Sequence, residues 1–263
     1  MRTTLRTRLT TALLVPIAAV AISACGSSEP TGLGTIDPVN PPTTAVVTTD
    51  AAPSNDITAP EAPAANSSIA ARLGGTTEVY AEPSEDAEVV TTIGATTELG
   101  SASTLLVVDQ QEDWIEVALP IRPNGATGWI PTAAAELRNN TYRIHVDIEA
   151  RTLSLMDGET VLVETPVAIG SDENPTPAGT YFVTDLVDTG DAAGAYGPFA
   201  FGLSGHSETL SEFGGGDGQL GIHGTNDPSS IGEAVSHGCV RVPNETIAQM
   251  VDLVPLGTPV TVV

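Results

Sequence analysis

The chain has 263 residues and is strongly acidic, with 33 Asp and Glu against nine Arg and no Lys, for a formal net charge of −24. Proteins that bind nucleic acid need clustered cations for the phosphates, so this balance excludes nucleic acid as an expected partner. The charge favours solubility and says little about the fold.

The first residues are expected to form an export signal. Three Arg at positions 2, 6 and 8 give a basic start, and an apolar run over residues 13–24 follows. A transmembrane helix needs about 20 residues, so this run is too short to span a membrane. A basic start followed by a short apolar run is typical of a signal peptide, which we place at residues 1–24.

The end of this signal resembles a bacterial lipobox. In that pattern the cysteine, here Cys25, becomes the lipidated N-terminus after cleavage; Ile22 stands where Leu is usual. The alternative is an ordinary signal peptide cut near Ala24. The lipobox resemblance implies an exported protein, anchored by lipid to the outer face of the cell membrane and facing the cell wall. Several acyl chains on one cysteine suffice for stable attachment.

Residues 25–68 have the composition of a tether. The segment is rich in Pro, Thr and Ala, has no aromatic residue, and its charges are all acidic up to residue 68. Such a segment buries too little apolar surface to offset its ordering entropy. We expect an extended, disordered linker between the membrane anchor and the folded part.

Residues 69–138 are expected to form a small all-β module. Short apolar stretches recur about every 8 to 12 residues with turn residues between them, as in a small barrel or sandwich. The sequence DWIEV at 113–117 alternates as a half-buried strand does. Val79-Tyr80 near the start and GWI at 128–130 near the end resemble the bacterial SH3-like domains of cell-envelope proteins. We interpret Trp114 and Trp129 as core residues.

Residues 139–263 form a second unit that also starts in β structure and is long enough for its own core. Apolar residues alternate over 142–148, and Asp157-Gly158 predicts a hairpin turn between strands at 153–155 and 161–169. A further strand is predicted at 181–183 and another at 260–263. Between them, Gly190–Gly218 is glycine-rich and is expected to be a lid or binding loop. A helix capped by Asn244 carries an apolar stripe at 247, 250, 251 and 254.

Two short segments, 221–225 and 236–241, hold the residues that could take part in catalysis. The segment 236–241, SHGCVR, carries Cys239, which has no disulfide partner if Cys25 is lipidated. His237 lies two residues before it, and His223 lies sixteen residues before it. An unpaired thiol with imidazoles nearby is typical of cysteine nucleophile chemistry.

Together with the upstream sequence TPAGTY at 176–181, these segments resemble the L,D-transpeptidase (YkuD-type) catalytic domain over roughly residues 140–263. The resemblance implies that Cys239 is the nucleophile and His223 the proton donor and acceptor, with His237 in a supporting role. It also implies that a backbone carbonyl at Gly224 holds the imidazole tautomer. The fold class is therefore mainly β: a small SH3-like β-barrel, then a β-rich L,D-transpeptidase domain with a short C-terminal helix.

Elementary chemistry adds expectations for the neighbouring residues. Gly238 lets the chain approach a substrate closely, and the amides of Gly238 and Cys239 are candidates for an oxyanion hole. Ser236 is expected to hydrogen-bond within the loop. Arg241 is either a partner for a substrate carboxylate or part of a structural salt bridge.

The resemblance implies acyl transfer on peptidoglycan stem peptides. The thiolate attacks the carbonyl of the third stem residue, terminal D-alanine leaves, and an amine of a neighbouring stem resolves the thioester into a 3→3 cross-link. Water as acceptor would make the protein an L,D-carboxypeptidase. Carbapenem-type β-lactams are implied inhibitors, and no cofactor or metal is expected.

Three other interpretations of the sequence remain open. Cys239 could be a buried structural thiol. A zinc ion could be bound by His223, His237 and Cys239, with water or Asp227 as fourth ligand. The protein could also be a non-enzymatic envelope-binding lipoprotein. The remaining histidines, His145 on a strand and His206 in the glycine-rich stretch, are expected to be non-catalytic.

Overall fold

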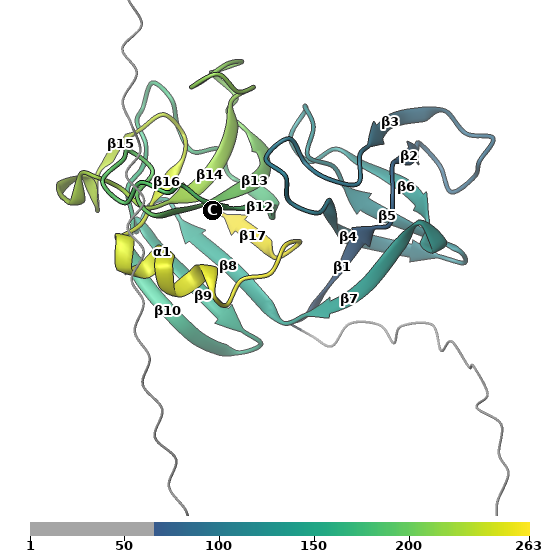
Figure 1. Ribbon diagram of the computed structural model, residues 1–263, viewed down its shortest axis with the longest axis horizontal. Coiled ribbons are helices and arrows are strands. Elements are labelled where there is room, and N and C mark those ends of the chain that lie inside the picture. Colours follow the sequence, from purple (N-terminus) through teal and green to yellow (C-terminus); the bar gives the residue numbers. More distant parts are fainter. Residues whose placement is uncertain (1–65) are drawn as a thin grey trace, which may run out of the picture. The chain divides into compact units, whose positions relative to one another are not determined.

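A computed structural model of the chain describes residues 66–263, which belong to one compact unit. The predicted signal peptide, Cys25 and nearly all of the predicted tether lie outside these residues. Two large sheets and one helix dominate the described part (Figure 1). The prediction of a mainly β protein with a short C-terminal helix is confirmed.

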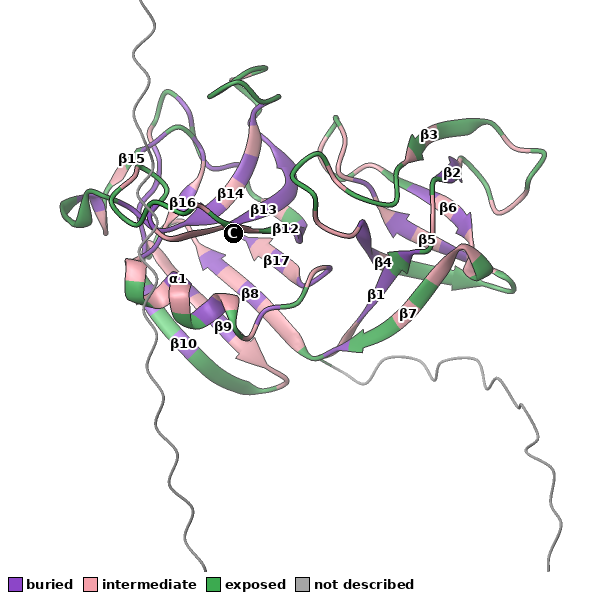
Figure 2. Ribbon diagram, viewed as in Figure 1, coloured by how far each residue is buried: buried purple, intermediate pink, exposed green. Residues whose placement is uncertain are grey.

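The first sheet has seven antiparallel strands in the order β3-β2-β6-β5-β4-β1-β7. Its strands are β1 (Ser68–Leu73), β2 (Thr77–Tyr80), β3 (Val89–Ile93), β4 (Thr104–Gln111), β5 (Trp114–Ala118), β6 (Thr127–Pro131) and β7 (Ala135–Asn140). One face is buried, with Ile115, Val117 and Ile130 fully covered (Figure 2). The all-β structure of this stretch is therefore confirmed, while its independence as a module and its SH3-like character stay predictions.

The two tryptophans of this module are not in its core, and that interpretation was wrong. Trp114 and Trp129 are both partly exposed, because they alternate with the buried residues of β5 and β6 and so point to the other face. Trp114 instead packs edge-on against the ring of Tyr80, whose centroid is 5.6 Å away.

The second sheet has eight strands in the order β10-β9-β8-β17-β12-β13-β14-β16. Its strands are β8 (Tyr142–Asp147), β9 (Thr152–Asp157), β10 (Thr160–Pro166), β12 (Gly179–Asp188), β13 (Phe199–His206), β14 (Gln219–His223), β16 (Val240–Arg241) and β17 (Pro259–Val262). The pairs β8–β17 and β14–β16 are parallel. The hairpin at Asp157-Gly158 is confirmed, with Thr160 paired to Asp157 and Gly158 at φ +55°.

Smaller elements complete this part. β11 (Ile169–Gly170) pairs in parallel with β15 (Ala234–Ser236), and single 3-10 turns cover Thr132–Ala134 and Pro228–Ser230. α1 (Asn244–Val251) buries Ile247 and Met250 completely, as the apolar stripe predicted. Its N-cap is Pro243, which has no side-chain cap, so the capping role predicted for Asn244 is wrong. No helix in residues 66–263 is long and apolar enough to cross a membrane.

The glycine-rich stretch contains a regular strand that the sequence analysis took for a loop. β13 lies between β12 and β14, and Phe201 and Leu203 are buried in the core below it. Ala200, Gly202 and Ser204 alternate with these apolar residues, so the small side chains hid the strand pattern. His206 ends the strand and is only 4% exposed, rather than lying on a loop. His145, on β8, is partly exposed and pairs with Ser154 and Thr261.

One phenylalanine connects the two sheets. Phe182 belongs to β12, yet its side chain is fully buried in the hydrophobic cluster of the first sheet, with Leu105, Ile115 and Ile130. The amide of Asn140, at the end of β7, also donates to the Thr258 hydroxyl at 3.0 Å in a buried contact. The first sheet is thus completed by a residue of the second.

We predict that Phe182→Ala lowers the free energy of unfolding by about 3–5 kcal/mol, because it leaves a cavity in the first sheet's core. Phe213, which is 43% exposed, is the matched control, and Phe213→Ala is expected to cost no more than about 0.5 kcal/mol. Denaturant unfolding of both variants measures the difference. A loss below about 1 kcal/mol for Phe182→Ala would show that the two sheets do not share this core.

Candidate active site

His223 lies where β14 runs between β13 and β16 in the second sheet. His223 is the last residue of the strand, paired with Ala200 of β13 on one side and Arg241 of β16 on the other. His223 is 5% exposed, and its Nδ1 lies 2.6 Å from the carbonyl oxygen of Gly224. A carbonyl can only accept, so Nδ1 carries the proton and Nε2 is left with a free lone pair. The geometry that the resemblance implied for Gly224 is therefore present.

The surroundings keep His223 neutral. Burial lowers its pKa to about 4; the hydrogen bond to Gly224 works in the opposite direction, and the positive charge of Arg241 adds to the lowering. The ring of Tyr196 covers it, with centroids 4.7 Å apart and planes tilted by 58°. At neutral pH the imidazole is therefore an unprotonated base.

Gly224 has no side chain because two other segments approach it closely. A Cβ there would lie 2.4 Å from the Oδ1 of Asn244 and 3.1 Å from the Cα of Gly197. Asn244 Oδ1 accepts a hydrogen bond of 2.7 Å from the Thr225 amide. The first residue of α1 thereby fixes the backbone that holds the His223 ring.

The loop that carries Cys239 is held by two hydroxyl groups. Ser236 Oγ donates to the Cys239 carbonyl at 2.6 Å and accepts from the Gly238 amide at 3.1 Å, so the expected hydrogen bonding within the loop is found. Thr176 Oγ1 donates to the Gly238 carbonyl and accepts from the Gly170 amide, both at 2.8 Å. The upstream sequence TPAGTY therefore supports the thiol loop directly. Gly238 has a φ of +119°, which requires glycine.

These contacts change the expectation for the oxyanion hole. The Gly238 amide is already bonded to Ser236 Oγ, so of the two expected donors only the Cys239 amide remains a candidate. Cys239 is partly exposed, which argues against a buried structural thiol. Burial of the thiol raises its pKa, while a backbone hydrogen bond from Gly221 and the charge of Arg241 lower it.

Arg241 is an unpaired cation beside the thiol. Its backbone pairs with His223, and its charge acts on the pKa of His223 and of Cys239. Within residues 66–263 no carboxylate lies within ion-pair distance of Arg241, and its buried Nε has no hydrogen-bond partner. The structural salt bridge considered from the sequence is therefore not formed.

His237 is exposed and stacks on Phe213, with ring centroids 4.8 Å apart and planes at 28°. Phe213 and Tyr196 were both missed by the sequence analysis. They are aromatic residues within a glycine-rich stretch, and that contrast was the available signal. Each covers one of the two histidines near the thiol.

The segment that carries Phe213 is anchored by the first sheet's β5–β6 connection. Arg122 donates to the carbonyls of Ser207, Leu210 and Asp217 at 2.6, 2.9 and 2.8 Å. Asn124 donates to the His206 carbonyl and accepts from its amide, both at 2.8 Å. Nothing local in the sequence marks either residue.

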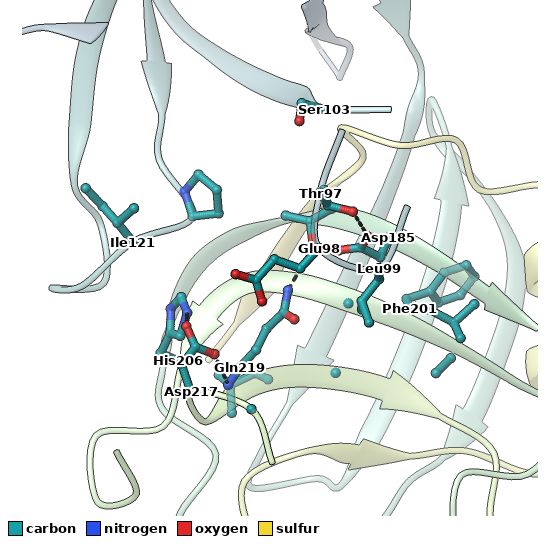
Figure 3. Close-up of a pocket in the computed structure, with 18 of the residues that line it drawn as sticks. Thr97, Glu98, Leu99, Ser103, Ile121, Asp185, Phe201, His206, Asp217 and Gln219 are labelled. Atoms are coloured by element: carbon teal, nitrogen blue, oxygen red, sulfur yellow. Dashed lines mark hydrogen bonds and ion pairs between the residues drawn. The ribbon is translucent and has the colours of Figure 1, made fainter. Parts of the chain in front are cut away.

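A cavity of about 760 Å³ brings these parts together (Figure 3). Its walls include Cys239, His223, Tyr196 and Phe213 of the second sheet's end, and residues of the loop 94–99 and Pro120-Ile121 from the first. The candidate nucleophile and base therefore share one cleft, whose far wall belongs to the first sheet. His237 and Arg241 do not line it.

The residues proposed as zinc ligands from the sequence are not arranged as a metal site. Among residues 66–263, no three His, Cys, Asp or Glu side chains are grouped so that they could hold a metal ion.

Part of the chain is similar to known proteins. Residues 141–262 match the family model described as the YkuD L,D-transpeptidase catalytic domain. The chain is 35% identical over 121 residues to the putative L,D-transpeptidase YkuD of Bacillus subtilis, which covers 46% of this chain and 65% of that protein. It is 56% identical over 39 residues to the probable L,D-transpeptidase YbiS of Escherichia coli, covering 15% and 13%. The match thus spans less than two thirds of these relatives.

Two solved structures are also similar. An L,D-transpeptidase from Mycobacterium smegmatis is 18% identical with a TM-score of 0.38, covering 61% of this chain and 89% of that one. Bd1075 of Bdellovibrio bacteriovorus is 30% identical with a TM-score of 0.38, covering 47% and 48%. By sequence, residues 141–262 are thus similar to the YkuD-type L,D-transpeptidase catalytic domain.

Proposed function

We propose that this protein is a peptidoglycan L,D-transpeptidase that uses Cys239 as nucleophile and His223 as the group that moves the proton. One observation carries the proposal: the Cys239 thiol and a neutral imidazole with a fixed tautomer line the same cleft. The match of residues 141–262 to the catalytic-domain family supports the reaction class.

The pKa directions favour a neutral pair in the resting enzyme. The pKa of Cys239 is raised and that of His223 is lowered, so a thiolate–imidazolium pair is disfavoured before substrate binds. We infer that Nε2 of His223 takes the thiol proton as the sulfur attacks the carbonyl carbon of the third stem residue. The Cys239 amide is the candidate donor to the developing oxyanion, a contact worth about 3 kcal/mol in other enzymes.

The collapse of the tetrahedral intermediate completes the acyl transfer. The C–N bond breaks, and the imidazolium returns the proton to the leaving amine of D-alanine. Arg241, unpaired and beside the thiol, is the proposed partner for the carboxylate of that D-alanine. An amine of a second stem then attacks the thioester to give a 3→3 cross-link, whereas attack by water would give an L,D-carboxypeptidase.

We predict that Cys239→Ala and His223→Ala each abolish acylation by a carbapenem, a β-lactam whose strained amide serves as an acyl donor. Mass spectrometry of the intact protein measures the adduct. Ser230→Ala is a control, because this hydroxyl is buried on the 3-10 turn 228–230 outside the cleft. An adduct on the Cys239→Ala protein, or near-normal acylation of the His223→Ala protein, would refute these roles. Lack of any adduct on the unaltered protein would favour an envelope-binding lipoprotein.

A defined tetrapeptide separates the two enzymatic outcomes. Incubation with the unaltered protein is expected to yield free D-alanine and a cross-linked dimer of stems, because the acyl-enzyme is resolved by an amine. Liquid chromatography with mass spectrometry identifies the products. Tripeptide as the sole product would make hydrolysis the function.

The pH profile tests the state of His223. Because the acid form cannot accept a proton, and its pKa is lowered to about 4, the acylation rate is expected to stay constant from pH 7 down to about 5 and to halve near pH 4. Arg241→Met removes a charge that lowers this pKa, so the midpoint should move to higher pH. An acid midpoint between pH 6 and 7 for the unaltered protein, typical of an exposed histidine, would contradict the burial argument.

We also propose the exported, lipid-anchored location, which rests on the sequence around Cys25 alone. Growth of a bacterium expressing the full chain with labelled palmitate should label the protein, and Cys25→Ala should abolish the label. Label retained on the Cys25→Ala protein would place the modification elsewhere.

A further inference from the structure

Asp185 is a buried carboxylate without a cation. The residue is 2% exposed and lines the active-site cleft from β12. Its Oδ1 accepts a hydrogen bond from the hydroxyl of Thr97, in the β3–β4 connection of the first sheet (Figure 3). No Arg or His in residues 66–263 lies within ion-pair distance of it. Buried charges in proteins are normally paired, so this one calls for a partner from outside the described chain.

The register of the sheet gives the position of Asp185 relative to the thiol. Asp185 pairs with Gly202 of β13, and Gly202 pairs with Gly221 of β14. Gly221 makes a backbone hydrogen bond to Cys239, whose pKa it lowers. With about 4.8 Å between neighbouring strands, Asp185 lies roughly 10 Å across the sheet from the strand position that contacts the sulfur.

The two strand positions between these points are both glycine, Gly202 and Gly221. A Cβ on Gly202 would lie 3.0 Å from Asp185 Oδ2 and 3.2 Å from Gln219 Nε2, and Gly221 is its neighbour on β14. The side chains of Asp185 and Gln219 therefore both reach over Gly202, whereas a Cβ on Gly221 would meet only the Phe201 carbonyl, which leaves an open strip from there toward Cys239. An extended ligand chain fits along such a strip.

The rest of the cleft favours a cationic ligand. Glu98 and Asp217 also line it, and no arginine does. Glu98 projects into the cleft from the same loop as Thr97 (Figure 3). Nε2 of His206 lies 2.9 Å from Oδ2 of Asp217, and the buried Nδ1 of His206 has no partner. The Asp, Glu and Arg side chains that line the cleft are thus all acidic, whereas the unpaired Arg241 lies on β16, on the opposite side of β14.

We propose that Asp185 binds the side-chain ammonium of a diamino acid at the third position of the donor stem, with Glu98 adding negative charge. This proposal rests on the proposed function. In such a residue six bonds separate the scissile carbonyl carbon from the terminal nitrogen, about 7–8 Å when extended. One charge-assisted hydrogen bond of about 2.8 Å completes the roughly 10 Å to Asp185. Asp185 is then a specificity-determining residue, and Thr97 positions its carboxylate.

The test compares two tetrapeptide stems that differ only in the third side chain, lysine or norleucine. Asp185→Asn keeps the shape and removes the charge. It is expected to lower kcat/KM for the lysine stem on the order of 10- to 100-fold, since a hydrogen bond to a charged group is lost. The norleucine stem and carbapenem acylation should change by less than about twofold. Glu164→Gln, an exposed acid of β10 outside the cleft, is the control for the loss of one charge.

Equal losses on both stems, or no loss on either, would overturn the subsite. If Asp185→Asn is unstable in a thermal melt, Thr97→Val gives the same comparison with a smaller selective loss expected. If the unaltered protein turns over neither stem, the proposed function fails. The subsite is then decided by calorimetric binding of both stems to the Cys239→Ala protein. Preference for lysine that disappears in Asp185→Asn supports it, and equal affinities overturn it.

Discussion

The hydrogen bond from Nδ1 of His223 to the Gly224 carbonyl is the constraint on which the candidate active site depends. It fixes which ring nitrogen keeps a lone pair, and it does so with a backbone group that cannot reverse its role. The Gly224 backbone is in turn held in place by the close approach of Asn244 from α1 and of Gly197. A short helix that contributes nothing to the cleft thereby helps to fix the tautomer of a ring inside it.

Burial has opposite effects on the pKa values of the two candidate catalytic groups. Desolvation raises the pKa of the Cys239 thiol and lowers that of the His223 imidazole, so both are uncharged at neutral pH. A neutral thiol is protected from unwanted oxidation, because the thiolate is the reactive form. Arg241 lowers both pKa values, so its charge favours the thiolate but disfavours the imidazolium. The proton transfer must then be coupled to attack on the substrate rather than precede it.

The sequence predicted those parts of the structure that depend on local pattern. Alternation over 142–148, the Asp157-Gly158 turn and the apolar stripe of α1 were sufficient, since each reflects one face of one element. β13 was missed because small residues, Ala200, Gly202 and Ser204, alternate with its buried apolar residues, and small residues do not give the usual apolar–polar pattern of a strand. Trp114 and Trp129 were misplaced because size alone does not tell which face of a strand is buried.

The residues of the candidate site also divide into those that a local pattern predicts and those that it does not. Cys239 and His223 were found by a motif, since the chemistry demands those residue types. Tyr196, Phe213, Arg122 and Asp185 act through contacts between segments up to 95 residues apart, such as that of Arg122 with Asp217. No local pattern encodes such pairs, and only the assembled sheets bring them together.

The contacts between the sheets argue that the first sheet is part of the catalytic site rather than a detachable module. Its core contains Phe182 of β12, its Arg122 holds the segment that carries Phe213, and its Thr97 holds Asp185. Removing it would expose an aromatic residue and release two walls of the cleft at once. A change in activity after such a deletion would therefore not distinguish wall binding by the first sheet from its structural role. Single substitutions at Thr97 or Arg122 separate these roles, because the first removes one hydrogen bond and the second removes three, and both leave the two cores filled.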